Sequence, residues 1–455
     1  MSQPVGLRVA DARFWDSEDL RGEIDRVFDV CQSCRLCFKF CDSFPRLFEY
    51  LDDGERPASA LREAEIDEVV DLCFQCRLCL PACPYAPPHD WGVDFPRLVL
   101  RSRAHRGRRE PLPWYKRQMQ NPARLGRLQA LAPRLSNYLL RAPAFRRFLE
   151  RLARVDRRKL LPPVAAESFG RWWRRIGKRA GAVAATPGGG QEAAAAEASP
   201  ERRVVLFSSC PVDWHRPEIG RAALDVLRHN GYEVERPGPQ ICCGMPRLDG
   251  GDVDAAAETA RQTVELLHPW VKRGYRVVIP SPSCSLMLRE EAPQLLGDGA
   301  AAEVAAATFD LCDFLFREAR EERVHKEFRR RAGPIRYHIP CHIREQQIGF
   351  RGRDILRWVS EGVEAIQECS GHDGTWSMDV AHFDDSLRHG RKAAEAMSSG
   401  EPCSARCSDC VLASLHLRQM ADVEVLHPVV VLAWAYGYDV GDAASAIAES
   451  HRVQT

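Results

Sequence analysis

The sequence predicts an α+β protein of several domains, in which an α-helical domain with two cysteine loops precedes two duplicated α/β units. Three observations support this prediction. Two identical cysteine runs lie in the first 100 residues, a low-complexity segment follows at residues 181–201, and strand-like runs alternate with helical stretches beyond it. A chain of 455 residues is long enough for roughly two to four domains.

The helical domain is predicted at residues 1–100 from two cysteine runs that are offset by 42 residues. Both runs read C-x2-C-x2-C-x3-C, the spacing with which bacterial ferredoxins bind [4Fe–4S] clusters. In that motif the fourth cysteine of each run binds the cluster of the other run. The sequence therefore predicts one cluster on Cys31, Cys34, Cys37 and Cys83, and a second on Cys73, Cys76, Cys79 and Cys41.

A structural zinc site is the alternative for these cysteines. Zinc sites use paired C-x2-C units that are separated by a long spacer. Two four-cysteine runs with a matched offset favour clusters instead. Pro84 follows the second run as the motif expects, whereas Asp42 stands after the first run.

The cysteine content also indicates the compartment. Eighteen cysteines in a long chain suggest reduced thiols or metal ligands, because disulfide frameworks belong to small secreted domains. The first residues show no secretory pattern, and the best apolar run, residues 429–436, is too short to span a membrane. We expect a cytoplasmic protein, with peripheral binding to the inner face of the cytoplasmic membrane as an option.

Residues 101–180 are predicted to form a basic arm of amphipathic helices. From residue 101 to residue 179, 23 Lys and Arg stand against four acids, a net charge of +19, which leaves −18 for the rest of the chain. Leucine and phenylalanine recur at steps of three and four residues along this arm. Such helices suit a membrane interface. A protein partner is the second reading, and nucleic acid is disfavoured because no nucleic-acid-binding motif accompanies the charge.

Residues 181–202 are predicted to be a flexible linker, and two α/β units are predicted at residues 203–330 and 331–445. Cysteines recur between the two units at offsets of 131, 127 and 126 residues, which indicates a duplication. Because cysteines that follow strands converge at one edge of a sheet, two further clusters are candidates. Their ligands would be Cys210, Cys242, Cys243 and Cys284 in the first unit, and Cys341, Cys369, Cys407 and Cys410 in the second.

The pattern of Cys210, Cys242-Cys243-Gly244 and Cys284 resembles the cysteine-rich CCG domain. That domain occurs in duplicate in heterodisulfide reductase subunits, in glycolate oxidase iron–sulfur subunits and in an iron–sulfur subunit of anaerobic glycerol-3-phosphate dehydrogenase. The order of a double-cluster ferredoxin unit before two CCG domains is similar to the last of these. Gly244 is expected to leave room where the backbone approaches a cluster.

Neither copy holds the complete five-cysteine CCG motif. Ser281 replaces a cysteine in the first copy, and Ser370 replaces one in the second. Four thiolates suffice for an ordinary cluster, but the five-cysteine non-cubane form is put in doubt. The alternative is that one or both copies keep the fold without a metal.

The resemblance implies an iron–sulfur electron-transfer subunit that accepts electrons from a flavoprotein dehydrogenase and passes them to a membrane quinone. We expect a redox subunit of an oxidoreductase complex of anaerobic respiration, with no catalytic residue of its own. The alternative is an enzyme like heterodisulfide reductase, which cleaves a disulfide at a CCG cluster. A third reading treats the clusters as structural elements of an assembly protein.

A few remaining residues are weaker candidates. His338, His342 and His372 lie near cysteines and could bind metal or carry protons, although single histidines are more often only packed. Cys312 and Cys403 fit no ligand pattern, and Cys312 is expected to be a small buried hydrophobe. No nucleotide-binding motif lies in a strand–turn–helix context, so we expect neither flavin nor nicotinamide on this chain.

Overall fold

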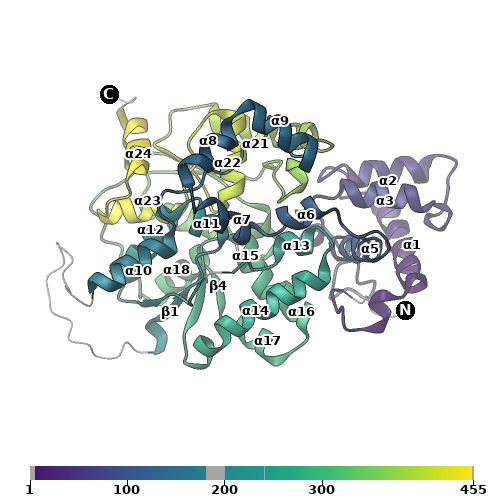
Figure 1. Ribbon diagram of the computed structural model, residues 1–455, viewed down its shortest axis with the longest axis horizontal. Helices are drawn as coiled ribbons and strands as arrows, with labels where there is room; N and C mark the ends of the chain where they lie inside the picture. The colour runs from purple at the N-terminus through teal and green to yellow at the C-terminus, as the bar shows by residue number, and fades with distance from the viewer. Residues whose placement is uncertain (1–5, 181–199, 240, 453–455) are drawn as a thin grey trace.

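The computed structural model describes residues 6–180, 200–239 and 241–452 (Figure 1). Most of the expected linker, residues 181–199, lies outside the described residues. The helical domain lies at one end of the molecule in Figure 1, and the α/β part occupies the other end. Mixed helix and parallel sheet agree with the predicted α+β class.

The helical domain packs its helices around one apolar core. Its helices are α1 (Ser17–Cys34), α2 (Ser43–Asp52), α3 (Glu63–Leu72), α4 (Cys79–Ala82) and α5 (Phe95–Arg109). Asp16 caps α1 by accepting from two backbone N–H groups, and Asp94 caps α5 by accepting from one. Phe28, Phe44 and Leu47 are buried between the helices. The cysteine loops are thus tied to a rigid support.

The basic arm lies along the α/β part rather than projecting from it (Figure 1). Its helices are α6 (Trp114–Met119), α7 (Pro122–Gln129), α8 (Pro133–Arg141), α9 (Pro143–Ala153) and α10 (Phe169–Ala180). A proline at the first turn starts α7, α8 and α9, where its missing N–H costs nothing. Helix α7 packs on α11 (Cys210–Trp214), and α10 packs on α11 and α12 (Pro217–His229).

The first α/β unit has a parallel sheet in the order β2-β1-β3-β4. Its strands are β1 (Arg203–Leu206), β2 (Glu233–Glu235), β3 (Arg276–Ile279) and β4 (Thr308–Asp310). Besides α11 and α12, its helices are α13 (Met245–Asp249), α14 (Val253–Lys272), α15 (Pro282–Leu286), α16 (Ala292–Leu296), α17 (Gly299–Ala306) and α18 (Leu311–Arg320), with a π-helical turn at Met287–Glu291. Short connections after β1, β3 and β4 place the following helices at the carboxyl edge of the sheet.

The second α/β unit has a parallel sheet in the order β6-β5-β7. Its strands are β5 (Ile335–His338), β6 (Val363–Ile366) and β7 (Ala405–Ser408). Its helices are α19 (Cys341–Glu345), α20 (Arg351–Leu356), α21 (Phe383–Ser398), α22 (Val411–Ala421), α23 (Pro428–Tyr436) and α24 (Asp442–Arg452). In both sheets the first strand of the unit is flanked by the second and the third.

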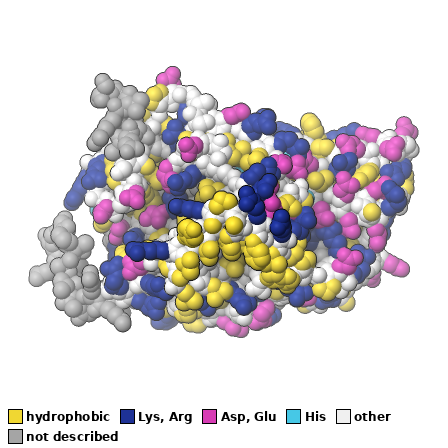
Figure 2. All heavy atoms as spheres, turned by 45° about the horizontal axis from the view of Figure 1, so that its top comes forward, with side chains coloured by type: hydrophobic (Ala, Val, Ile, Leu, Met, Phe, Trp, Pro, Cys, Tyr) yellow, Lys and Arg dark blue, Asp and Glu magenta, His cyan; other side chains and the backbone are white. Residues whose placement is uncertain are grey.

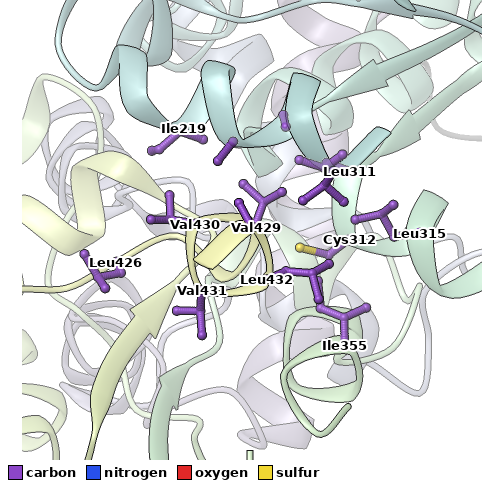
Figure 3. Packing of buried hydrophobic residues seen from close by; sticks show 14 of the residues in the cluster. Ile219, Leu311, Cys312, Leu315, Ile355, Leu426, Val429, Val430, Val431 and Leu432 are labelled. Carbon is purple, nitrogen blue, oxygen red and sulfur yellow. The ribbon is translucent and has the colours of Figure 1, made fainter. Parts of the chain in front are cut away.

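Helix α23 joins the two α/β units in one core (Figure 3). All nine of its residues are buried, and it packs against α12 of the first unit and α20 of the second. Val429, Val430 and Leu432 each contribute about 1.5–3 kcal/mol by leaving water. This is the apolar run at residues 429–436, and burial between two units explains why it lacks a polar face.

Among the helices that the structure describes, none combines the length and the apolar character that crossing a bilayer would need.

Candidate metal centres and an adjoining cavity

The first cysteine set comes from the end of α1, the loop that follows it and the residue after α4. Helix α1 ends at Cys34, and Arg35 turns the chain with a left-handed φ of 54°. The thiol of Cys31 lies beside Cys34, Cys37 and Cys83. Burial raises the pKa of Cys31 well above its usual value, and the neighbouring thiols raise it further. These are the four residues that the ferredoxin spacing predicts for one cluster.

The second set gathers Cys41, Cys73, Cys76 and Cys79. Gln75 and Arg77 adopt positive φ values of 51° and 60°, which wraps the loop tightly around the thiols. Burial raises the pKa of Cys41 to about 12, and Cys73 adds to the shift. The two sets are adjacent, since Cys37 Sγ lies 4.0 Å from the backbone oxygen of Cys79.

Asp42, which departs from the ferredoxin motif, contacts the second α/β unit. Its Oδ2 accepts hydrogen bonds from Arg388 at 2.5 Å and from His389 at 2.9 Å, both on α21. The contact with His389 is the main cause that lowers the pKa of Asp42, and Asp42 raises the pKa of His389. A proline here could not make this contact.

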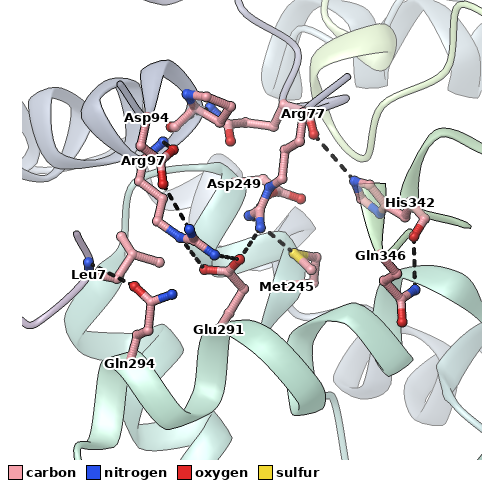
Figure 4. A network of polar contacts seen from close by, with 12 residues as sticks. Leu7, Arg77, Asp94, Arg97, Met245, Asp249, Glu291, Gln294, His342 and Gln346 are labelled. Atoms are coloured by element: carbon pink, nitrogen blue, oxygen red, sulfur yellow. Dashed lines mark hydrogen bonds and ion pairs between the residues drawn. The ribbon is translucent and has the colours of Figure 1, made fainter. Parts of the chain in front are cut away.

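A buried ionic network holds the second loop on the first α/β unit (Figure 4). Arg77, which follows Cys76, is fully buried and pairs with Glu291. Arg97 on α5 also pairs with Glu291, at 2.9 Å, and with Asp94 at 2.7 Å. The sequence carried no signal for this network, because its partners are about two hundred residues apart.

The four cysteines expected in the first α/β unit are brought together. Cys210 contacts Cys242, and Cys243 contacts both Cys242 and Cys284. Contacts with Cys210 and Cys243 lower the pKa of Cys242, whereas Cys210 and Cys243 have raised pKa values, as expected for thiols that share protons. Each of the three segments that carry them follows a strand, so the sheet edge positions all four.

Gly244 adopts a left-handed backbone conformation directly after Cys243. Its φ is 106°, a conformation that residues with a side chain rarely adopt, and it caps the start of α13. A Cβ at this position would lie 3.1 Å from the backbone oxygen of Ala256 on α14. Glycine is needed here for the turn and for packing on α14.

The four cysteines expected in the second unit are not brought together. Cys341 contacts Cys369, and Cys76 of the second loop lies near both. Cys410 lies near Cys284 of the first unit and lines the same cavity as Cys341. Cys407 lies on β7, fully buried in the apolar core with Cys403 and Asp409 as its neighbours. The expected fourth ligand set therefore needs correction, because the strand directs Cys407 into the core.

All three candidate histidines make hydrogen-bond contacts within the protein. His338 Nδ1 lies 3.1 Å from Ser408 Oγ, and burial lowers its pKa to about 4. His342 contacts Ser283 Oγ at 2.9 Å and the backbone oxygen of Gln75 at 3.2 Å, so it links the second cysteine loop to both α/β units. The third, His372, lines an apolar cavity.

Cys312 is buried as expected, yet it is not simply a small hydrophobe. Its thiol donates to Asp409 Oδ1 at 2.9 Å, and Asp409 Oδ2 accepts from Tyr337. His427 completes a Cys/Asp/His group whose ligand atoms lie within 4.8 Å of one another. Its Nδ1 accepts from the backbone N–H of Val429 at 3.1 Å, so these side chains already serve protein hydrogen bonds.

The cavity has a volume of about 530 Å³ and joins the cysteines of three parts of the chain. The arm supplies one apolar wall, which includes Leu125, Leu139, Leu140, Phe145, Leu149 and Leu152. The sulfur-bearing wall consists of Cys76, Cys210, Cys242, Cys243, Cys284, Cys341 and Cys410. Amphipathic spacing predicted an apolar face on the arm, but not that this face covers the cysteines.

The arm also carries apolar side chains that face solvent. They are Trp114, Leu128, Leu131, Leu135, Tyr138, Phe148, Leu152 and Leu160. Figure 2 shows a broad hydrophobic area on one face of the molecule, with Lys and Arg at its edge. Apolar patches rimmed by polar residues mark interaction sites.

The donor sets fit iron–sulfur clusters. All eighteen cysteines are free thiols, and two four-thiol sets have the ferredoxin arrangement. This combination of a helical cysteine-loop domain with a cysteine-bearing sheet edge defines an iron–sulfur protein.

Comparison with known proteins agrees with this class. Residues 24–108 match the Fer4-like domain of citrate utilization protein B, and residues 204–289 match the cysteine-rich CCG domain. Lactate utilization protein A of Geobacillus thermodenitrificans is 30% identical over 198 residues, which cover 41% of this chain and 78% of that protein. The chain belongs to the family of cysteine-rich-domain iron–sulfur proteins that includes lactate utilization protein A.

Two further relatives are subunits of redox enzymes. One subunit of the anaerobic glycerol-3-phosphate dehydrogenase of Escherichia coli is 24% identical over 64% of this chain and 69% of its own length. One subunit of the fumarate reductase (CoM/CoB) of Methanothermobacter marburgensis is 27% identical over 53% of this chain. The matched region spans about half (48%) of that last protein. These relatives support an electron-transfer role.

Proposed function

We propose that this protein is the electron-transfer subunit of an oxidoreductase complex, which takes electrons from a flavoprotein dehydrogenase and delivers them to a membrane quinone. One observation carries the proposal. Cys76 of the second cysteine set lines the same apolar cavity as the thiols of the first α/β unit. A route through adjacent thiol sets therefore ends at a space that suits an apolar electron acceptor.

The residues that would hold clusters follow from the three assembled sets. Cys31, Cys34, Cys37 and Cys83 would hold one [4Fe–4S] cluster, and Cys73, Cys76, Cys79 and Cys41 a second. Cys210, Cys242, Cys243 and Cys284 would hold a third. When bound, such clusters accept and release single electrons at potentials tuned by burial and by hydrogen bonds to sulfur.

Electrons would enter the protein at the first cysteine set. Leu36 and Phe38, in the loop of that set, are large apolar residues that are exposed to solvent. Aromatic and leucine side chains exposed beside a redox centre offer a docking contact for a partner. We assign the flavoprotein to this face of the helical domain.

Electrons would leave the protein at the cavity that the arm covers. It places an exposed apolar area and many arginines next to the cavity wall. Each Lys or Arg near an anionic membrane surface is worth about 1 kcal/mol. The arm would hold the cavity near the bilayer, from which an apolar quinone could enter.

The two α/β units are proposed to be duplicates. Their sheets share the same order around the central strand, and cysteines follow corresponding strands: Cys210 after β1 and Cys341 after β5. Only the first copy keeps its four cysteines together, so it is the copy that would bind a cluster.

The test is anaerobic reoxidation of the chemically reduced holoprotein. We expect a short-chain quinone analogue to bleach the reduced-cluster EPR signals and to yield the quinol. Reoxidation by a disulfide, with thiols as products and no reaction with quinone, would replace this proposal by the heterodisulfide-reductase-like alternative. Clusters that no acceptor reoxidises would favour a structural role.

A further inference from the structure

A buried lysine lies behind the wall of the cavity. Lys159, between α9 and α10, is 4% exposed, and no carboxylate of the described chain lies within ion-pair distance of it. Its Nζ lies 2.9 Å from His416 Nδ1 and 3.2 Å from Ser377 Oγ. Burial lowers the pKa of Lys159 to about 7, so the ammonium and the amine are both populated near neutral pH.

Hydrogen bonds connect this lysine to the cavity. Ser377 Oγ, which contacts Lys159, also lies 3.2 Å from His372 Nδ1. His372 is one of the residues that line the cavity, and burial lowers its pKa far below the usual value, so its ring is neutral. The chain Lys159, Ser377 and His372 therefore runs from behind the wall to the cavity itself.

We propose that Lys159, Ser377 and His372 deliver protons to a quinone that is reduced in this cavity; the inference rests on the function proposed above. Reduction of a quinone to a quinol consumes two electrons, supplied by the dehydrogenase through the iron–sulfur centres, and two protons. His372 would release the proton on Nε2 to a quinone oxygen and take one on Nδ1 from Ser377. The Lys159 ammonium would restore Ser377 and then regain a proton from solvent. The His372 ring, which now carries its proton on Nδ1, would rotate to present that proton to the cavity, and a second passage would supply the second proton.

The surroundings of Lys159 suit this role. Its neighbour in sequence, Leu160, is exposed, so the backbone beside the lysine reaches the surface of the molecule. Arg158 forms ion pairs with Asp156 and Asp384. Arg146 donates a hydrogen bond to the backbone oxygen of Lys159 at 2.7 Å. His416 on α22 and the ring of Phe383 on α21, 5.9 Å away, complete the groups that face the amine. Burial lowers the pKa of His416 to about 3, so this ring is neutral beside Lys159.

The experiment compares the Lys159→Ala holoprotein with wild type and with Lys392→Ala, a control at an exposed lysine on α21. Three quantities are measured: binding of a quinone analogue by quenching of tryptophan fluorescence, quinol formation between pH 6 and 9, and electron transfer to ferricyanide, which needs no proton. We expect Lys159→Ala to slow quinol formation at least tenfold and to remove the decline of the rate above pH 7. Binding should be kept, and added methylamine should restore the rate by occupying the space of the lost side chain.

The outcomes separate the two proposals. A Lys159→Ala protein that forms quinol at the wild-type rate, with the wild-type pH profile, would overturn the proton chain alone. Slowing of the ferricyanide and quinone reactions by the same factor, without rescue by methylamine, would show a structural role and would also overturn it. A wild-type holoprotein that reduces ferricyanide but no quinone would overturn both proposals.

Discussion

Arg77 and Glu291 form a buried ion pair that joins the second cysteine loop to the first α/β unit. Glu291 also binds Arg97, so two guanidinium groups share one carboxylate in the interior. The strong interaction with both arginines lowers the pKa of Glu291, although burial alone would raise it. The redox loop is thereby fixed at the wall of the cavity.

Glu291→Gln should destabilise this junction by about 3–5 kcal/mol, because it removes the charge of the carboxylate that pairs directly with Arg77 and Arg97 in the interior. Urea unfolding and limited proteolysis between the helical domain and the α/β part would measure the effect. Glu290→Gln, one residue away and without an ion pair among the described residues, is the control. Equal stability of the two variants would contradict the importance of the network.

Cys34→Ala and Cys76→Ala should each remove one cluster, since each changes a different ferredoxin set. The iron content should fall by about four atoms per chain in each variant. Iron and sulfide analysis with EPR would show which signal is lost. Cys403→Ser, at a buried cysteine outside all three sets, should keep the full iron content.

Cys284→Ser and Cys407→Ser should differ, although both cysteines belong to corresponding closing motifs. Cys284 lies in the assembled set of the first α/β unit, whereas Cys407 is held in the core by β7. We expect Cys284→Ser to lose about four irons and Cys407→Ser to lose none. Loss of iron from the Cys407→Ser protein would show that a fourth set assembles.

Lys159 should make the stability of the protein depend on pH. The folded state lowers its pKa from 10.5 to about 7, so the unfolded chain binds more protons between these values. The free energy of unfolding contributed by this group should therefore rise as the pH increases from about 7 to 10.5. Urea unfolding at several pH values should show this rise in the wild type relative to Lys159→Met. A constant difference between the two proteins would contradict the lowered pKa.

Leu135→Glu should weaken binding to vesicles of anionic phospholipid at least tenfold, because a carboxylate would enter the apolar area of the arm. Leu36→Glu is a matched control, since Leu36 in the helical domain is 58% exposed and Leu135 on α8 is 57% exposed. Sedimentation with vesicles at low and high salt would measure both proteins. Equal loss of binding in the two variants would argue against the arm as the membrane contact.

Local pattern was enough for much of the fold. Helix α14 is one of the helical stretches that the sequence shows beyond residue 201, because its apolar spacing and its capping Asp252 act within the segment itself. Strands β1 and β3 are among the strand-like runs that alternate with these helical stretches. The helices of the arm were likewise predicted from apolar residues that recur at steps of three and four.

Contacts between distant segments could not be predicted in this way. The spacing of the closing cysteines placed Cys407 with Cys341, yet the pleat of β7 turns its side chain into the core. Nothing in the pattern around Lys159 indicated that it would meet Ser377, more than two hundred residues later. The role of Asp42 likewise became visible only through its partners on α21.

By itself, the sequence determined the iron–sulfur class, because three of the four ligands in each ferredoxin set are spaced within a few residues, and local geometry suffices to bring those three together. Only the tertiary structure decided which other groups lie next to these cysteine loops. Packing of the helical domain, the arm and the two sheets brings Cys76, the thiols of the first unit and His372 to one cavity. Such convergence depends on the burial of apolar surfaces from remote segments, which no local pattern specifies.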